Sequence, residues 1–249
     1  MSVGSTVVSA IVVIALIIGL MYMLWFMYRN WTSSNASSPW LVKDTRIARQ
    51  GLVIPGNMIP LSNDGRFGME FSYSMWIYVN QWDTPVAQQS KQPLKHILHK
   101  GDSSPAPVFQ APGIWMDQSS NEIVVVMNTF NKTDTKDGCV VSNIPIGLWV
   151  NLIVICIENK IDIYVNGGLK NRCTLNGIPM QNMGDVYITQ NGGYDGFISK
   201  VRYYNYALPY WKVEQILADG PSKAPCTETG ATPPYQSIDY WLQRNKQSL

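Results

Sequence analysis

Charged residues are scarce in this chain. They make up 14% of its 249 residues, and 19 basic residues against 17 acidic ones leave a net charge of +2. A typical soluble protein has about a quarter charged residues, and the near balance excludes a polybasic nucleic-acid-binding protein and an acidic disordered chain. Only five of the acids are Glu, a good helix former. Together with 19 Gly, 15 Pro and 13 Tyr, this scarcity favours a β-rich protein with many turns.

Cysteine and histidine are also few, with four and two residues. There is no CxxC motif and no Cys/His cluster, which argues against a zinc centre. Cys139 and Cys173 lie near expected strands and could pair, while Cys156 lies in an apolar run and is expected to be buried. His96 and His99 are expected on opposite faces of one strand, because side chains alternate. They are therefore not expected to act together on one ligand.

One long apolar segment lies near the N-terminus. It begins at Val7 and ends at Tyr28, which makes 22 residues without a charge. As a helix it would be about 33 Å long, enough to cross the ~30 Å core of a lipid bilayer. A signal peptide has a charged start and a shorter apolar core of ~7–15 residues. We therefore expect residues 1–29 to be a retained transmembrane anchor.

The charges around this segment predict its orientation. No basic residue precedes it, and four follow it: Arg29, Lys43, Arg46 and Arg49. The positive-inside rule then places the C-terminal part on the cytoplasmic side, or on the corresponding side of a virion membrane. Glycosylation motifs at Asn30, Asn35 and Asn131 point the other way, towards the cell surface. Chance alone gives about two such motifs in a chain of this composition, so they are weak evidence.

Short alternating or apolar runs separated by turn residues fill residues 48–220. Strands are expected at residues 71–79, 96–99, 114–116, 123–127, 149–158, 161–165, 185–189 and 197–204. Asn166-Gly167 is a strong hairpin signal, because both residues tolerate a positive φ. A helix is expected only at residues 208–217, and Trp76 and Trp149 are expected in the core. This pattern predicts an all-β protein, an antiparallel β-sandwich behind one transmembrane helix.

The two segments that flank this domain are polar or rich in proline. Residues 30–47 are expected to form a polar linker above the membrane. Residues 221–249 are expected to form a Pro-rich connector and a C-terminal interaction tail. Within the tail, a short helix would present an aromatic and apolar face for a neighbouring protein, made of Ile238, Tyr240, Trp241 and Leu242. Folding of the tail over the edge of its own domain is almost equally plausible.

Several short motifs resemble one known superfamily. They are the Trp76 strand, the turn Lys100-Gly101-Asp102, and the run Tyr164-Val165-Asn166-Gly167. Over residues 66–217 their order and spacing are similar to laminin G-like, or concanavalin A-like, lectin and glucanase jelly rolls. The last strand departs from the family, with Ser199-Lys200 where Asp-Glu is common. Any role of those acids is therefore not carried over.

The resemblance implies a calcium site on loops at one edge of the sandwich. Asp117, Asp185 and Asp195 lie at strand ends and could supply oxygen ligands, which calcium prefers. Solvated turn aspartates are the simpler interpretation of all three, because Asp is common in turns. No other cofactor is expected.

Catalysis is not expected. Glycosidases of the retaining kind need two carboxylates ~5–5.5 Å apart, and the related glucanases carry two Glu on one strand around an Asp. None of the five Glu here has that setting. We therefore expect a non-enzymatic, membrane-anchored structural or interaction protein, similar to capsid-associated components of large DNA viruses between inner membrane and capsid. A membrane-anchored cell-surface lectin is the alternative, and a glycoside hydrolase is a remote one.

Overall fold

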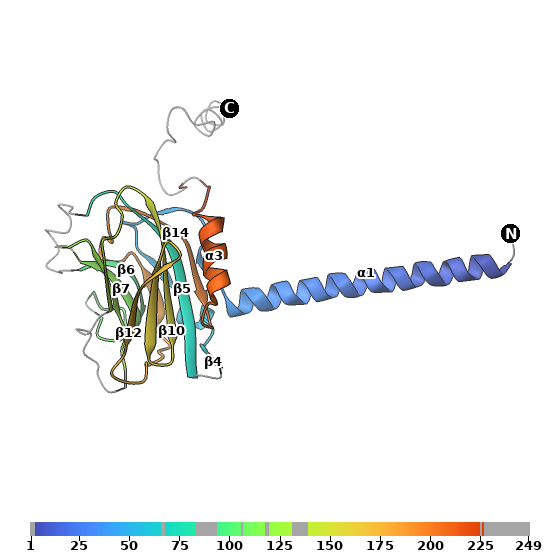
Figure 1. Cartoon of the computed structure of the whole chain (residues 1–249), viewed down its shortest axis with the longest axis horizontal. Coiled ribbons are helices and arrows are strands. Elements are labelled where there is room, and N and C mark those ends of the chain that lie inside the picture. Colours follow the sequence, from blue (N-terminus) through green and yellow to red (C-terminus); the bar gives the residue numbers. More distant parts are fainter. Residues whose placement is uncertain are drawn as a thin grey trace, which may run out of the picture.

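A single long helix leads into a body of β-strands (Figure 1). The computed structural model describes residues 3–65, 68–82, 94–105, 107–117, 120–130, 139–224 and 226. Helix α1 covers Val3–Ser37, and within it Ile11–Arg29 is long and apolar enough to cross a membrane. None of this segment is buried within the described part of the chain. Its length and composition fit a single membrane span or a signal sequence.

The strands form two antiparallel sheets. The eight-stranded sheet has the order β1-β14-β5-β10-β11-β12, with β2 beside β14 and β4 beside β5. Its strands are β1 (Trp40–Val42), β2 (Arg46–Ile47), β4 (Asn63–Gly65), β5 (Gly68–Val79), β10 (Trp149–Ile157), β11 (Lys160–Val165), β12 (Gly168–Thr174) and β14 (Gly196–Tyr204). The six-stranded sheet has the order β3-β13-β6-β7-β8-β9. Its strands are β3 (Leu52–Ile54), β6 (Leu94–Gly101), β7 (Gln110–Asp117), β8 (Glu122–Val126), β9 (Cys139–Ser142) and β13 (Asp185–Ile188), and a short 3-10 helix covers Gly56–Met58. The predicted β-sandwich is confirmed.

The core lies between the inner faces of the two sheets. Alternate residues of β10 and β11 point into it, as their pattern predicts, and their partners come from β5 and from β7, β8 and β13. The buried side chains include Tyr73, Met75, Ile77, Ile114, Met116, Ile123, Val125, Leu152, Val154, Ile161, Ile163, Val186 and Ile188. Cys156 is buried among them, as expected for a small apolar side chain.

A disulfide closes one edge of the sandwich. Cys139 of β9 and Cys173 of β12 are bonded, with Cα atoms 5.9 Å apart. These strands are the last ones of the two sheets, so the bond joins the sheets at that edge. The two cysteines that the sequence placed near strands are therefore a pair. The hairpin that leads into β12 is the predicted one, with φ of 49° at Asn166 and 78° at Gly167.

Helix α3 covers the outer face of the eight-stranded sheet (Figure 1). It spans Tyr210–Asp219, two residues later than predicted, because Pro209 is extended and stands just before the first turn. Val213 is buried against Ile153, Ile155 and Tyr204 in a second apolar cluster outside the main core. Gly220, with φ of 63°, ends the helix.

The structure differs from the linker expected at residues 30–47. Helix α1 continues to Ser37, and residues 40–42 and 46–47 are strands that pair with β14. Ser and Asn weaken a helix by only a few tenths of a kcal/mol each, so a helix already formed can run through them. It stops where Pro39 restricts the backbone of Ser38.

Trp76 is buried as predicted, but Trp149 is only half-buried, because it lies on the outer face of β10 beside Tyr78.

The predicted tail residues Ile238, Tyr240, Trp241 and Leu242 lie outside the described residues, which end at residue 226. Their role in binding a partner stays a prediction.

Candidate functional site

The end of α1 is fixed to strand β14. The carbonyl of Ser37 accepts a hydrogen bond of 3.0 Å from the backbone N–H of Asn205, and the carbonyl of Pro39 accepts one of 3.2 Å from Tyr203. Arg202 donates from Nε to the Ser38 carbonyl, at 2.9 Å, and from Nη2 to Ser38 Oγ, at 2.9 Å. We call these contacts the α1–β14 junction. These contacts attach the C-terminal end of α1 directly to the sandwich.

Aromatic rings flank the junction. The guanidinium of Arg202 lies 4.6 Å from the ring centre of Trp40 and 5.2 Å from that of Tyr204. Cation–π contacts of this kind contribute about 0.5–1 kcal/mol at exposed sites and more where water is excluded. Arg202 therefore joins α1, β1 and β14 through one side chain.

The Ser199-Lys200 departure from the family has a structural role here. Lys200 donates from Nζ to the carbonyl of Gly220, at 2.8 Å, and to that of Asp219, at 3.1 Å. A cation at this place satisfies the last carbonyls of α3 and complements the helix dipole. Ser199 Oγ accepts a hydrogen bond of 3.0 Å from the backbone of Ser222. The two residues fasten the C-terminal end of α3 to the sheet.

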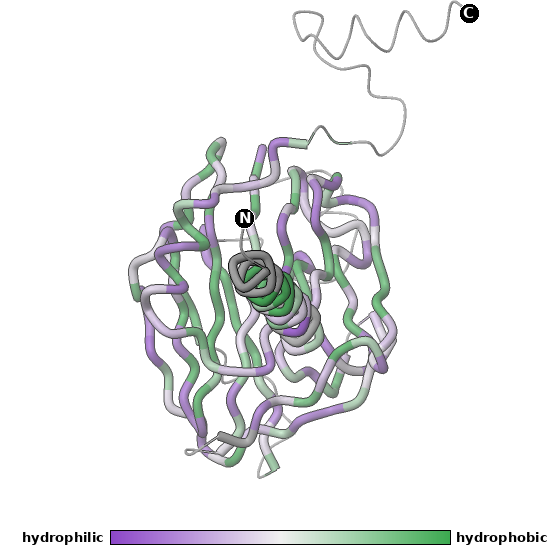
Figure 2. Tube along the Cα trace, turned by 90° about the vertical axis from the view of Figure 1, so that its right-hand side faces the viewer, coloured by the Kyte–Doolittle hydropathy of each residue, from purple (hydrophilic) through white to green (hydrophobic). Residues whose placement is uncertain are grey.

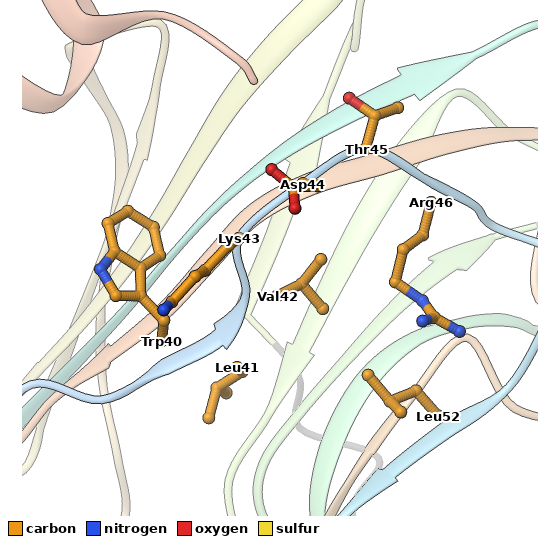
Figure 3. Close-up of a pocket in the computed structure, with 8 residues that line it drawn as sticks. All are labelled: Trp40, Leu41, Val42, Lys43, Asp44, Thr45, Arg46 and Leu52. Atoms are coloured by element: carbon orange, nitrogen blue, oxygen red, sulfur yellow. The ribbon is translucent and has the colours of Figure 1, made fainter. Parts of the chain in front are cut away.

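A cleft of about 370 Å³ lies beside the junction, at the edge between the two sheets. Figure 3 shows Val42, Arg46 and Leu52 directed into one space, whereas Asp44 and Thr45 point away from it. The aromatic ring at this cleft is Trp40, and the Arg202 guanidinium already lies over it. Arg202 therefore occupies one face of that ring.

The two histidines lie on the same face, which corrects the sequence prediction. Nε2 of His96 is 2.7 Å from Nδ1 of His99 on the outer side of the six-stranded sheet. The alternation is broken by a β-bulge in β6, where Ile97 and Leu98 both point into the core. Trp115 lies beside both rings, with centroids at 4.7 and 6.1 Å, and Tyr187 stacks on His99 at 4.7 Å. We call these four residues the histidine cluster.

The hydrogen bonds of the cluster define the tautomers. The backbone N–H of Gln190 donates to His96 Nδ1, at 2.8 Å, so a neutral His96 carries its hydrogen on Nε2. It then donates to His99 Nδ1, and His99 donates from Nε2 to the carbonyl of Asp102, at 2.9 Å. The chain of three bonds is complete only when both imidazoles are neutral.

A loop covers the histidine cluster. Its described part comprises residues 102–105 and 107–109. The Asp102 carboxylate accepts from the backbone of Ser104, at 2.7 Å, and Val108, at 3.1 Å, which folds the loop on itself. Gln110 donates to the carbonyl of Pro107, at 2.8 Å, and accepts from Trp115 Nε1, at 2.7 Å. The cluster is thus covered and fastened by directional hydrogen bonds.

Burial sets the charge state of this region. It lowers the pKa of His96 well below the ordinary value, and the neighbouring His99 lowers it further. Burial also lowers the pKa of His99, against the opposing effect of Asp102. Desolvation lowers the pKa of Lys100 to about 8. The two imidazoles of the cluster are therefore neutral near pH 7, whereas the neighbouring Lys100 stays mostly protonated.

The three aspartates expected at a calcium site do not converge. Asp117 is paired with the first residue of β6 and Asp185 with the last, so they lie about 23 Å apart along the strand. Asp185 accepts a hydrogen bond of 2.8 Å from Gly56, and Asp195 forms an ion pair of 3.3 Å with Arg49. Among the described residues no three His, Cys, Asp or Glu side chains form a group suited to a metal ion. Calcium binding stays a prediction that would need other ligands.

The strand carboxylates have structural partners. Asp162 forms a two-pronged pair with Arg172, with two bonds of 2.6 Å, and Glu122 accepts from Ser142 at 2.8 Å. On the outer face of β7, the side chains beside Trp115 are the two histidines. Asp162 and Glu122 are thus bonded to neighbouring side chains of the sandwich.

Sequence reasoning missed the main contacts of both outer faces. The junction joins Ser38 to Arg202 across 164 positions, which no local pattern reveals. The histidine cluster had a local signal, the run His-Ile-Leu-His, in which two adjacent apolar residues break the period of two.

Comparison with solved structures gives distant matches. The binding domain of botulinum neurotoxin serotype G is 13% identical, with a TM-score of 0.48, and the match covers 70% of this chain and 46% of that one. An HCR/D mutant is 11% identical, with a TM-score of 0.50, over 75% and 52%. A Trypanosoma rangeli sialidase in complex with the inhibitor DANA is 10% identical, with a TM-score of 0.45, over 69% and 26%. This chain therefore matches about half or less of each of these structures.

Comparison with sequences gives the family. A search of curated proteins gave no match. The family model described as the concanavalin A-like lectin/glucanases superfamily matches residues 56–213, which is more than half of the chain. That range includes both sheets except β1, β2 and β3, and it ends inside α3. The chain belongs to the concanavalin A-like lectin/glucanases superfamily.

Proposed function

We propose that this protein is a non-catalytic recognition module that α1 holds on a membrane. The observation that carries the proposal is the uninterrupted helix from the apolar segment Ile11–Arg29 to the α1–β14 junction. A cleaved signal sequence has no need of a rigid connection to the folded domain. A permanent anchor gains from one, because the domain is then presented in a fixed orientation.

The six-stranded sheet lies on the side of the sandwich away from α1 and α3 (Figure 1). In this proposal that side, with its rim loops, faces the partner. The partner is a neighbouring protein of a larger assembly, and an assembly between a virion membrane and its capsid is the setting that the sequence predicts. A role without catalysis is supported by four carboxylates that are already bonded to other groups of the protein: Asp162, Asp185, Asp195 and Glu122.

Two features give opposite indications of the side of the membrane on which the folded domain lies. The basic residues after the span favour the cytoplasmic side. The Cys139–Cys173 disulfide favours an oxidising compartment, where such bonds persist. Protease protection in sealed vesicles from the native source, with thiol alkylation before and after reduction, decides between them.

The anchor itself has a direct test. Expressed full-length chain should stay with membranes after alkaline carbonate extraction and should float with them on a density gradient. Its N-terminal sequence should still include residues 11–29. A mature protein that starts after Arg29, or one that carbonate releases, would contradict the proposal.

A glycan-binding lectin is the second candidate function, and the family membership favours it. The cleft in Figure 3 has the polar side chains of Lys43 and Arg46 at its wall. A glycan array probed with the detergent-solubilised chain, with Arg46→Ala as the matched variant, tests this function. Binding that Arg46→Ala abolishes would favour the lectin over the protein-assembly module.

A further inference from the structure

Helices α1 and α3 lie on the same side of the sandwich (Figure 1). Helix α3 packs on the outer face of the eight-stranded sheet, and α1 leaves that sheet at the junction. Seen along α1, the sandwich spreads out behind the helix on all sides (Figure 2). We propose that the outer face of α3 rests in the headgroup layer of the bilayer that α1 spans. This inference rests on the proposed anchor and adds a fixed height and orientation to it.

The height of the sandwich above the bilayer matches the thickness of α3. The apolar segment ends at Arg29, and the helix meets the sheet at Ser37. Eight helical residues correspond to about 12 Å. A helix with its side chains is about 10–12 Å across, and α3 lies between the sheet and the membrane side. Helix α3 therefore fills the gap that α1 leaves.

The chemistry of the exposed face of α3 suits the headgroup layer. Trp211 is 65% exposed and Tyr210 is 59% exposed, and Lys212 follows Trp211. The Lys212 ammonium lies 5.8 Å from the Trp211 ring centre and donates to Gln215 Oε1, at 2.8 Å. Trp and Tyr favour the membrane interface, where one end of the side chain is apolar and the other is hydrated. Glu214 on the same face argues against deeper insertion and against a need for anionic lipids.

Both helices are attached to one strand, so their relative position is fixed. Arg202 and Tyr203 of β14, together with Asn205 just after it, bind residues 37–39 at the end of α1, and Lys200 of β14 binds the end of α3. Residues 30–37 contain no Gly or Pro that would make a hinge. The span and α3 therefore meet the bilayer together.

Fluorescence quenching in vesicles tests the contact. The full-length chain with Cys226→Ser is placed in phosphatidylcholine vesicles that carry a doxyl spin label near the headgroup. An environment-sensitive thiol dye is attached at Trp211→Cys or, as the matched control on the far side, at Val108→Cys. Cys156 is buried and the other two cysteines are bonded, so the new thiol takes the dye. We expect blue-shifted emission and strong quenching at position 211 and neither at position 108.

The outcomes separate this inference from the anchor. Protein that floats with vesicles but is quenched equally at both positions would overturn the α3 contact and leave the anchor intact. Protein that does not float would overturn the anchor. Insertion of seven alanine-rich residues after Asn35 keeps the helical phase and raises the sandwich by about 10 Å. We expect this variant to float and to lose quenching at position 211, and quenching that survives the insertion would contradict the fixed height.

Discussion

The two outer faces of the sandwich are covered by different kinds of interaction. On the eight-stranded sheet the apolar side of α3, centred on Val213, covers Ile153 and Ile155. On the six-stranded sheet a loop covers His96 and His99 and is fastened by hydrogen bonds to side chains and backbone. Apolar burial is non-directional and largely insensitive to pH, whereas a hydrogen-bond network depends on geometry and protonation. We therefore expect substitutions and acid to lower the stability of the protein more on the six-stranded side than on the eight-stranded side.

Trp115→Ala should have the largest effect among single substitutions. Trp115 is 5% exposed, packs against both histidines and donates to Gln110. Its removal leaves a cavity and an unpaired amide, and should lower the free energy of unfolding by about 3–5 kcal/mol. Trp149→Ala on the other face is the control, and should cost about 1–2 kcal/mol because that side chain is half-buried. Thermal melts of the detergent-solubilised chain measure both, and equal losses would contradict the difference between the faces.

Loss of the disulfide should have the next largest effect. The bond between Cys139 and Cys173 closes a loop of 34 positions and joins an edge strand of each sheet. Chain-entropy arguments give about 3–4 kcal/mol for a loop of that length. The double variant Cys139→Ser, Cys173→Ser should show this loss in denaturant unfolding. Reducing agent should then change wild-type stability but not that of the double variant, and an equal response of both would show that the bond does not form.

Acid should destabilise the histidine side selectively. The folded pKa of His96 and that of His99 are lowered, so the unfolded chain binds more protons once the pH falls below about 6.5. Stability is then complete above this pH and falls as the pH decreases through it, by up to about 1.4 kcal/mol per pH unit for each histidine. Unfolding measured from pH 7.5 to 5 should show the decrease.

A paired variant shows whether the histidines cause that decrease. His99→Gln removes one titrating group and can still accept from His96 and donate to Asp102. Its stability should fall less steeply with acid than that of the wild type. Parallel curves for the two proteins would mean that the pH dependence has another origin.

The difference between the faces also explains which features of the fold and of the candidate site could be predicted from the sequence. Eight strands follow from alternating or apolar runs; in β11, for example, the inward Ile161 and Ile163 are apolar and Asp162 between them is polar. The strands β1, β2, β3, β4, β9 and β12 were not predicted. The histidine cluster did not follow, because a bulge at Ile97 and Leu98 shifts the alternation by one residue. The α1–β14 junction did not follow either, because polar contacts between distant segments leave no period in the sequence. Helix α3 was predicted within two residues, since its apolar spacing is local.

The smallest effect is expected from removing the Lys200 ammonium on the apolar side. Lys200 donates to the carbonyls of Asp219 and Gly220 at the end of α3, and it is only partly buried. Lys200→Met keeps the length of the side chain and removes the charge, so it should cost about 1 kcal/mol. Lys170→Met, at an exposed position of β12, makes the same change of charge away from α3 and should cost less. Because apolar packing at Val213 holds the middle of α3, Lys200→Met should increase hydrogen exchange only in its last turn. Exchange that increases throughout α3 would show that this face, like the histidine face, depends on a directional bond.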